Sequence, residues 1–145
     1  MKSILLQNAT LINPEAGTEE IGNLLIKGTI ISEIGAKIGF ASNEVEIIDC
    51  TGKYLAPGIV DIGVKVCEPG ERHKESFKSA GLAAAAGGIT TIVTRPDTLP
   101  AIDTPETLEF MRRRANKTAP INVLSMAALT KGRYGREMTE IGFLM

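Results

Sequence analysis

Residues 55–70, LAPGIVDIGVKVCEPG, constrain this chain more than any other stretch. A Pro-Gly turn precedes an apolar run and a second Pro-Gly turn follows it, which predicts a buried strand between two turns. Side chains alternate along a strand, so one face should carry small or polar residues: Asp61, Gly63, Lys65 and Cys67. The other face should be aliphatic and pack under helices: Ile62, Val64 and Val66. A polar face on a buried strand is expected to line a site.

The chain before this segment has the pattern of a β meander. Short apolar runs are predicted to be strands at residues 4–6, 10–12, 24–26, 30–34, 45–48 and 54–55. A turn is expected at Gln7 and Asn8 between the first two runs, and a hairpin turn at Lys27 and Gly28. Residues 1–55 should therefore form a small all-β unit.

After Gly70 the pattern changes to alternating helices and strands, which predicts a parallel sheet. Helices are expected at residues 74–86, after Thr104 and from Gly135 onward, with strands at 89–94 and 121–127. Gly87 and Gly88 should stop the first helix. Thr104 is predicted to cap the second helix, with Pro105 in its first turn. An apolar stripe should follow on its inner face: Leu108, Met111 and Ala115.

These motifs resemble the dihydroorotases of the amidohydrolase superfamily. That family reads Asp-x-His-x-His-x-Arg-Glu-Pro-Gly at its first barrel strand, and this chain reads DIGVKVCEPG from Asp61. The family's Met-Pro-Asn-Thr after the second strand is Arg-Pro-Asp-Thr here, at residues 95–98. The resemblance extends over essentially all 145 residues, through residues 83–88, 103–106 and 128–132.

The resemblance implies an α/β fold in two parts. Residues 1–55 would be the N-terminal part of a small β-sandwich, and residues 56–145 the opening strand–helix units of a (β/α)₈ TIM-type barrel. A closed barrel takes roughly 250 residues. We therefore expect an incomplete barrel in a chain that ends early, inside a helix at Met145.

The resemblance also implies that four site positions have lost the family's residues. Gly63 and Lys65 stand in place of two metal-binding histidines, Cys67 in place of a substrate-binding arginine, and Asp97 in place of a substrate-binding asparagine. Active members use zinc to activate water. In this chain we expect no catalytic, metal-binding or substrate-binding residue and no cofactor. We expect the Lys65 ammonium to pair with Asp97; the alternative is that both side chains reach solvent.

Other residues that could carry chemistry have simpler interpretations. His73 is the single histidine, and a catalytic zinc takes about three protein ligands, so His73 should be structural or solvated. Three arginines, 112–114, are explained by the dipole at a helix end rather than by nucleic acid. Gly87 and Gly88 lack the surroundings of a phosphate-binding loop. Cys67 has no histidine base, and Asp61 alone cannot form a metal cage.

Composition narrows the possible functions. A net charge of −1 argues against nucleic acid and acidic membranes as partners. Two cysteines, Cys50 and Cys67, form no disulfide framework, and no stretch is long and apolar enough for a signal peptide or a membrane span. A cytoplasmic protein is expected, with self-association through exposed strand edges.

Three functional interpretations stay open at this point. The resemblance implies a catalytically inactive dihydroorotase-like protein of pyrimidine biosynthesis that acts as a structural partner of aspartate transcarbamoylase. The alternatives are a fragment of a dihydroorotase-type, metal-dependent cyclic amide hydrolase, and a decayed gene product without function. Replacement of both histidines favours the first over the second, because shortening alone would have left them intact.

Overall fold

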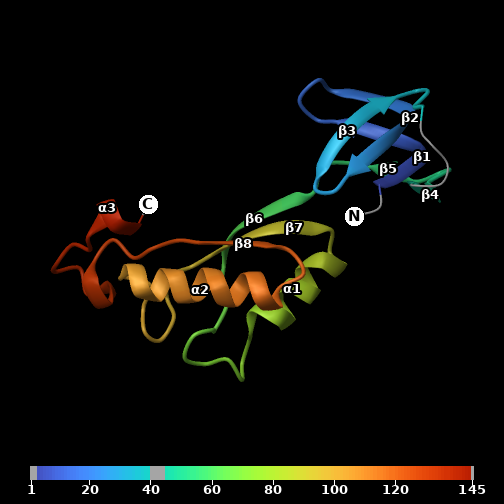
Figure 1. Ribbon diagram of the computed structural model, residues 1–145. Coiled ribbons are helices and arrows are strands. Elements are labelled where there is room, and N and C mark those ends of the chain that lie inside the picture. The colour runs from blue at the N-terminus through green and yellow to red at the C-terminus, as the bar shows by residue number, and fades with distance from the viewer. Residues whose placement is uncertain (1–2, 40–44, 145) are drawn as a thin grey trace. The chain divides into compact units, whose positions relative to one another are not determined.

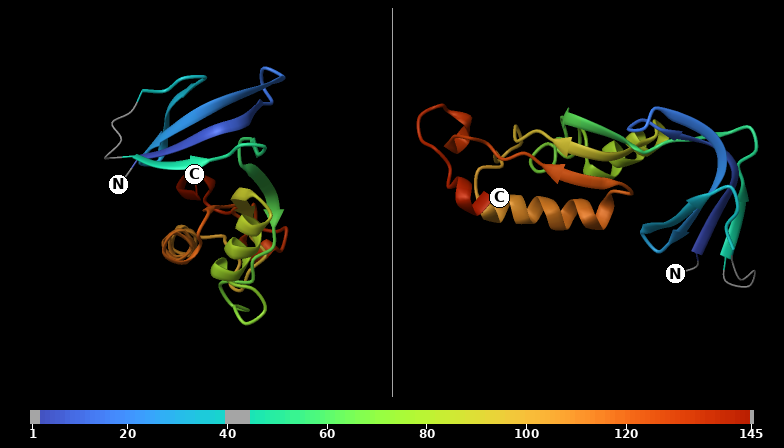
Figure 2. Two further views of the ribbon diagram at one scale, coloured as in Figure 1. Left: turned by 90° about the vertical axis from the view of Figure 1, so that its right-hand side faces the viewer. Right: turned by 90° about the horizontal axis from the view of Figure 1, so that it is seen from above.

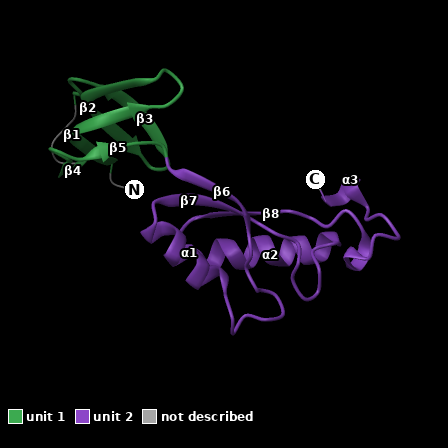
Figure 3. Ribbon diagram, turned by 180° about the vertical axis from the view of Figure 1, so that it is seen from behind, with its two compact units in different colours: residues 1–57 green, residues 58–145 purple. Residues whose placement is uncertain are grey.

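The computed structural model describes residues 3–39 and 45–144, which divide into two compact units. Unit 1 comprises Met1–Pro57 and unit 2 comprises Gly58–Met145, two residues beyond the division expected from the sequence (Figure 3). No helix in the described part of the chain is long and apolar enough to cross a membrane.

Unit 1 is a five-stranded sheet whose strands are curved and twisted (Figures 1 and 2). Its strands are β1 (Ser3–Asn13), β2 (Thr18–Lys27), β3 (Ile30–Gly35), β4 (Val45–Asp49) and β5 (Tyr54–Leu55). The order is β3-β2-β1-β4, and β5 also pairs with β1. The pairs β1–β2 and β2–β3 are antiparallel, whereas β4 and β5 run parallel to β1. The predicted β unit is thus a single mixed sheet.

The predicted turn at Gln7 and Asn8 is wrong, because β1 continues through it. Pairing with β2 shifts register between Leu6 and Ala9, and Asn8 takes a left-handed φ of 60°. The Asn8 backbone N–H donates to Asn23 Oδ1 at 3.0 Å, and its side-chain amide donates to Asp49 Oδ1 at 3.2 Å. Hydrogen bonds to both neighbouring strands therefore hold a bulge where the sequence favours a turn. The hairpin turn before Ile30 is confirmed, with Gly28 at a φ of 64°.

Unit 2 contains a parallel sheet of three strands in the order β6-β7-β8, as the strand–helix alternation predicted. The strands are β6 (Ile59–Val64), β7 (Ile89–Thr94) and β8 (Asn122–Ser125). Helices α1 (Phe77–Ala86) and α2 (Pro105–Thr118) lie on one face of this sheet (Figure 1). A core forms between the helices and the sheet from these buried residues: Val66, Phe77, Ala84, Ile92, Ile102, Met111, Ala115 and Val123.

The helix boundaries follow local capping signals. Ser76 caps α1 in a reciprocal arrangement with Ser79, so α1 begins three residues later than predicted. The predicted start of α2 is confirmed, since Thr104 Oγ1 accepts a hydrogen bond from the Thr107 N–H at 3.3 Å and Pro105 is the first helical residue. Met111 and Ala115 are buried as expected.

Three predictions near the end of the chain need correction. Helix α2 continues to Thr118, so Arg112–Arg114 lie in its middle and the helix dipole does not explain them. Strand β8 is shorter than residues 121–127. A helix does not begin at Gly135, which has a left-handed φ of 70°; a short 3₁₀ turn (Lys131–Arg133) precedes it, and helix α3 spans Ile141–Leu144.

The simple alternation predicted for β6 is also wrong. Pairing with β7 skips Gly63, so Ile62 lies beside Val93 and Val64 beside Thr94. Gly63 has a φ of 92°, a conformation that glycine adopts without the strain of a Cβ. This bulge turns Ile62 away from the helices, and the residue is 69% exposed, whereas Val66 is buried. The aliphatic residues of this stretch therefore do not share one face.

Candidate functional site

The candidate site lies where strands β6, β7 and β8 end. The Arg95 N–H donates to the Val64 carbonyl at 2.9 Å, and the Met126 N–H donates to the Thr94 carbonyl at 2.9 Å. These bonds extend the ladder of the sheet beyond its last strand residues and fix the start of each following loop. Ligands of parallel sheets bind outside the carboxyl ends of the strands. Side chains that follow β6 and β7 are therefore the natural place to look for function.

Lys65 and Asp97 form an ion pair at this end of the sheet. The Lys65 Nζ lies 2.9 Å from Asp97 Oδ2, which confirms the predicted pairing. The Asp97 side chain is 11% exposed and the Lys65 side chain is 52% exposed. The carboxylate is thus held inward, while the ammonium stays half in solvent.

Arg95 is a third member of this cluster and was not among the predicted site residues. Its Nη2 lies 3.2 Å from the same oxygen, Asp97 Oδ2. Burial of Asp97 raises its pKa, but the hydrogen bond from Lys65 and the charges of Arg95 and Lys65 outweigh that effect. The net result is a pKa below the usual range of an aspartate, so Asp97 is ionised at neutral pH. The sequence signal that could have identified Arg95 is its position two residues before Asp97, directly after a buried strand.

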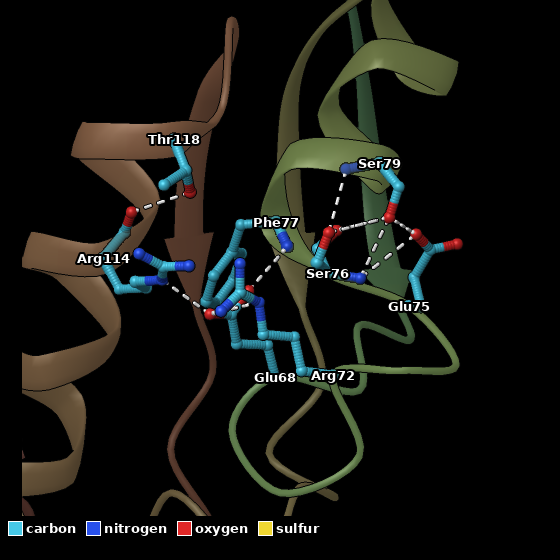
Figure 4. Close-up of polar contacts among 8 residues, drawn as sticks. All are labelled: Glu68, Arg72, Glu75, Ser76, Phe77, Ser79, Arg114 and Thr118. Atoms are coloured by element: carbon cyan, nitrogen blue, oxygen red, sulfur yellow. Dashed lines mark hydrogen bonds and ion pairs between the residues drawn. The ribbon is translucent and has the colours of Figure 1, made fainter.

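Glu68 organises the loop that follows β6 (Figure 4). Its side chain is 5% exposed, and Oε2 accepts a hydrogen bond from the Phe77 N–H at 3.1 Å, at the start of α1. Oε1 accepts from Arg114 Nε at 2.7 Å, and Arg72 Nε lies 3.7 Å from the same oxygen. The carboxylate therefore joins this loop to α1 and α2. The sequence identified Glu68 as a motif residue but gave no sign of its partner Arg114.

Gly70 brings the same loop against the segment that follows β7. Its φ is 97°, and a Cβ at this position would lie 2.3 Å from the Leu99 carbonyl oxygen. The Leu99 N–H donates to the Pro69 carbonyl at 3.4 Å. The Glu68-Pro69-Gly70 turn thus fixes the two loops that carry Lys65 and Asp97.

The remaining predicted positions contribute little to this cluster. Gly63 offers no side chain, and Cys67 is a half-buried free thiol. Asp61 lies within β6 and is exposed. His73 is exposed in the loop before α1.

The residues at these strand ends do not fit the zinc that the family resemblance implies. Within residues 3–39 and 45–144, no group of three or more His, Cys, Asp or Glu side chains could hold a metal ion. A protonated lysine has no lone pair to donate to a metal, and Arg95 adds a second positive charge beside the one carboxylate. The donor chemistry is that of an ion-pair cluster.

Comparison with known proteins agrees with the resemblance to dihydroorotases. A family model described as "Dihydro-orotase-like" matches residues 52–145. A dihydroorotase of Caldicellulosiruptor saccharolyticus is 40% identical over 141 residues, covering 97% of this chain and 33% of that protein. A dihydroorotase of Staphylococcus epidermidis is 43% identical over 117 residues, covering 81% of this chain and 28% of the relative. The chain therefore spans about a third of the length of these relatives.

Solved structures show the same architecture. An L-hydantoinase from Arthrobacter aurescens superposes with a TM-score of 0.78 at 23% identity, over 90% of this chain and 28% of that chain. A D-hydantoinase superposes with a TM-score of 0.72 at 28% identity, over 88% and 27% of the two chains. These likenesses confirm the predicted fold class: part of a β-sandwich followed by strand–helix units of a barrel.

Proposed function

Because the chain belongs to the dihydroorotase-like family, we propose that it is a non-catalytic member of pyrimidine biosynthesis and a structural partner of aspartate transcarbamoylase. The observation that carries the first half of this proposal is the Lys65–Asp97 ion pair of 2.9 Å. By the family resemblance, these two positions belong to a metal-binding histidine and a substrate-binding asparagine. Here they neutralise each other.

The loss of catalysis follows from the chemistry of these side chains. Hydrolysis of a cyclic amide at neutral pH by this family depends on a metal that lowers the pKa of water and polarises the carbonyl. Gly63 supplies no ligand atom, and the Lys65 ammonium repels a divalent cation. Asp97 Oδ2 already accepts from Lys65 and lies beside Arg95, and an ionised carboxylate cannot donate a hydrogen bond to a substrate as an asparagine amide can.

The scaffold around the site is retained, which supports a role in binding another protein. Glu68 makes buried contacts to Phe77 and Arg114, and Gly70 approaches Leu99 closely. A net charge of −1 gives no reason to expect nucleic acid or an acidic membrane as the alternative partner. The family resemblance makes aspartate transcarbamoylase the partner to test first.

A second candidate function is favoured by sequence identity. Identity of 40% over 97% of the chain to a dihydroorotase suggests a piece of a metal-dependent cyclic amide hydrolase. In this second proposal the metal ligands that Gly63 and Lys65 do not supply would have to come from outside these 145 residues.

Metal content and activity separate the two candidates. We expect no stoichiometric zinc by elemental analysis and no ring opening of dihydroorotate above background, with the Staphylococcus epidermidis dihydroorotase as the positive control. Stoichiometric zinc together with turnover of dihydroorotate would refute the non-catalytic proposal.

Partnership needs its own experiment. Co-expression with the aspartate transcarbamoylase of the same organism should give co-elution in size-exclusion chromatography at micromolar concentration. An Arg113→Glu variant, altered on the exposed side of α2, tests whether co-elution depends on general surface charge. Separate elution, with unchanged transcarbamoylase activity, contradicts the partnership.

A further inference from the structure

The Lys65–Asp97–Arg95 cluster has an uneven distribution of charge. Lys65 Nζ and Arg95 Nη2 contact the same oxygen of Asp97, at 2.9 Å and 3.2 Å. Two cations therefore share one carboxylate, and the three groups carry one net positive charge. The cationic side chains are each 52% exposed, whereas the carboxylate is 11% exposed. The surface that faces solvent is consequently cationic.

Neighbouring charges do not cancel this excess. Glu71 lies close enough to Lys65 for the lysine charge to contribute to a lowered pKa, although the hydrogen bond from Lys74 is the main cause. Glu71 is thus paired with Lys74, and this second ion pair is neutral overall. His73, which also acts on the pKa of Glu71, would add positive charge when protonated. The five side chains together carry one net positive charge, from three cations (Lys65, Arg95 and Lys74) and two anions (Asp97 and Glu71).

The geometry suits a small oxyanion better than a cation. Lys65 Nζ and Arg95 Nη2 lie 2.9 Å and 3.2 Å from the same oxygen, Asp97 Oδ2, so the two nitrogens are close to each other. One phosphate or carboxylate group can therefore contact both. Lys65 has N–H donors beyond the one given to Asp97, and the Arg95 guanidinium, which is an ion-pair partner of Asp97, has five N–H donors. Asp97, whose side chain is largely buried, keeps the donors together and so reduces the entropy lost on binding.

We infer that Lys65 and Arg95 form a binding site for a small oxyanion, of phosphate or carboxylate chemistry, at the carboxyl end of the three-stranded sheet. The inference rests on the proposed function in one respect, namely that no metal occupies these strand ends. Where the family resemblance places a cation, this chain would bind an anion. Arg95 takes part directly, and Asp97 acts as a positioning residue.

Titration with inorganic phosphate and, separately, with acetate tests the inference. The backbone amide shifts of Arg95, Asp97 and Thr98 are followed by NMR in a buffer of low chloride, because chloride screens the charges and competes for the site. We expect saturable shifts in the millimolar range. Saturation by both probes supports a general oxyanion site, and saturation by phosphate alone supports a site for tetrahedral oxyanions. The inference is overturned if neither phosphate nor acetate gives saturable shifts.

Variants assign the binding to the two cations. Lys65→Met and Arg95→Met should each weaken binding by about three- to tenfold, as expected for loss of one exposed charge-assisted contact. Matched controls are Lys78→Met on α1 and Arg113→Met on α2, which remove the same charges from exposed helix positions and should leave affinity unchanged. Equal weakening in the controls would overturn the assignment.

Far-UV circular dichroism of each variant establishes that it is folded. Should Lys65→Met fail to fold, Lys65→Gln gives the same test with a polar side chain. The outcome is independent of the zinc and activity measurements. A chain without zinc that also fails to bind phosphate or acetate refutes the oxyanion site and leaves the non-catalytic proposal standing.

Discussion

Replacement of Glu68 by alanine should destabilise unit 2 more than any single change of a surface charge. The Glu68 carboxylate is nearly buried and accepts from the Phe77 N–H at 3.1 Å and from Arg114 Nε at 2.7 Å. Its removal leaves an N–H of the first turn of α1 and a largely buried guanidinium without their partner. Breaking a buried ion pair by removing one partner costs about 3–5 kcal/mol when both groups are fully buried. Because Arg114 is 27% exposed, we expect about 3 kcal/mol, at the low end of that range.

Glu68→Gln provides the graded comparison. The amide oxygen still accepts from one of the two donors, but the negative charge between Arg114 and Arg72 is lost. We expect a loss of about 1.5 kcal/mol, since hydrogen bonds to charged groups contribute more than neutral ones. The matched control is Glu109→Ala, whose carboxylate is 55% exposed and pairs with Arg113 at 3.6 Å. Exposed pairs contribute about 0.2–1 kcal/mol, so this control should change stability little.

Thermal unfolding followed at 222 nm is a suitable assay, because the helices of the described residues all lie in unit 2. In a unit of this size 1 kcal/mol shifts Tm by about 4–8 °C, so Glu68→Ala should lower Tm by more than about 10 °C. A double-mutant cycle with Arg114→Met should give a coupling of about 1–3 kcal/mol. The reasoning is refuted if Glu68→Ala and Glu109→Ala unfold within about 2 °C of each other.

Three further outcomes are expected from the described contacts. Gly70→Ala should lower the free energy of unfolding, measured in urea, by about 2 kcal/mol or more, because residue 70 has a φ of 97° and its added Cβ would lie 2.3 Å from the Leu99 carbonyl oxygen. The control Gly142→Ala should be near neutral, because a Cβ there would meet open space. Because the pKa of Asp97 is lower in the folded chain than its unfolded value near 3.8, ionised Asp97 should stabilise the fold above that pH. This contribution should be lost as the pH falls through the lower folded pKa. The prediction is contradicted if the free energy of unfolding of Asp97→Asn falls with pH as steeply as that of the wild type. The chain should self-associate through exposed apolar strand residues, and Ile62→Ser with Leu124→Ser, 69% and 59% exposed in wild type, should reduce the mass measured by light scattering; a monodisperse wild-type monomer would argue against it.

Local signals in the sequence were sufficient to predict much of unit 2. Thr104, Pro105 and the stripe of Met111 and Ala115 lie within three turns of one helix, so their effects depend on neighbours a few residues away. The β-branched run of β7 and the glycines before it are equally local, and the parallel order β6-β7-β8 follows from strand–helix alternation. The Lys65–Asp97 pair was predicted because two motifs of the resemblance fix both positions at neighbouring strand ends.

Tertiary structure decided the features that depend on contacts between distant residues. Asn8 forms a bulge rather than a turn because Asn23 and Asp49 supply hydrogen bonds from other strands. Glu68 and Arg114 are 46 residues apart, and no local pattern relates them. Ile62 left the expected face through the register of β6 against β7. Backbone propensities act over a few residues, whereas register, bulges and shared ion pairs are set by which segments meet in the folded chain.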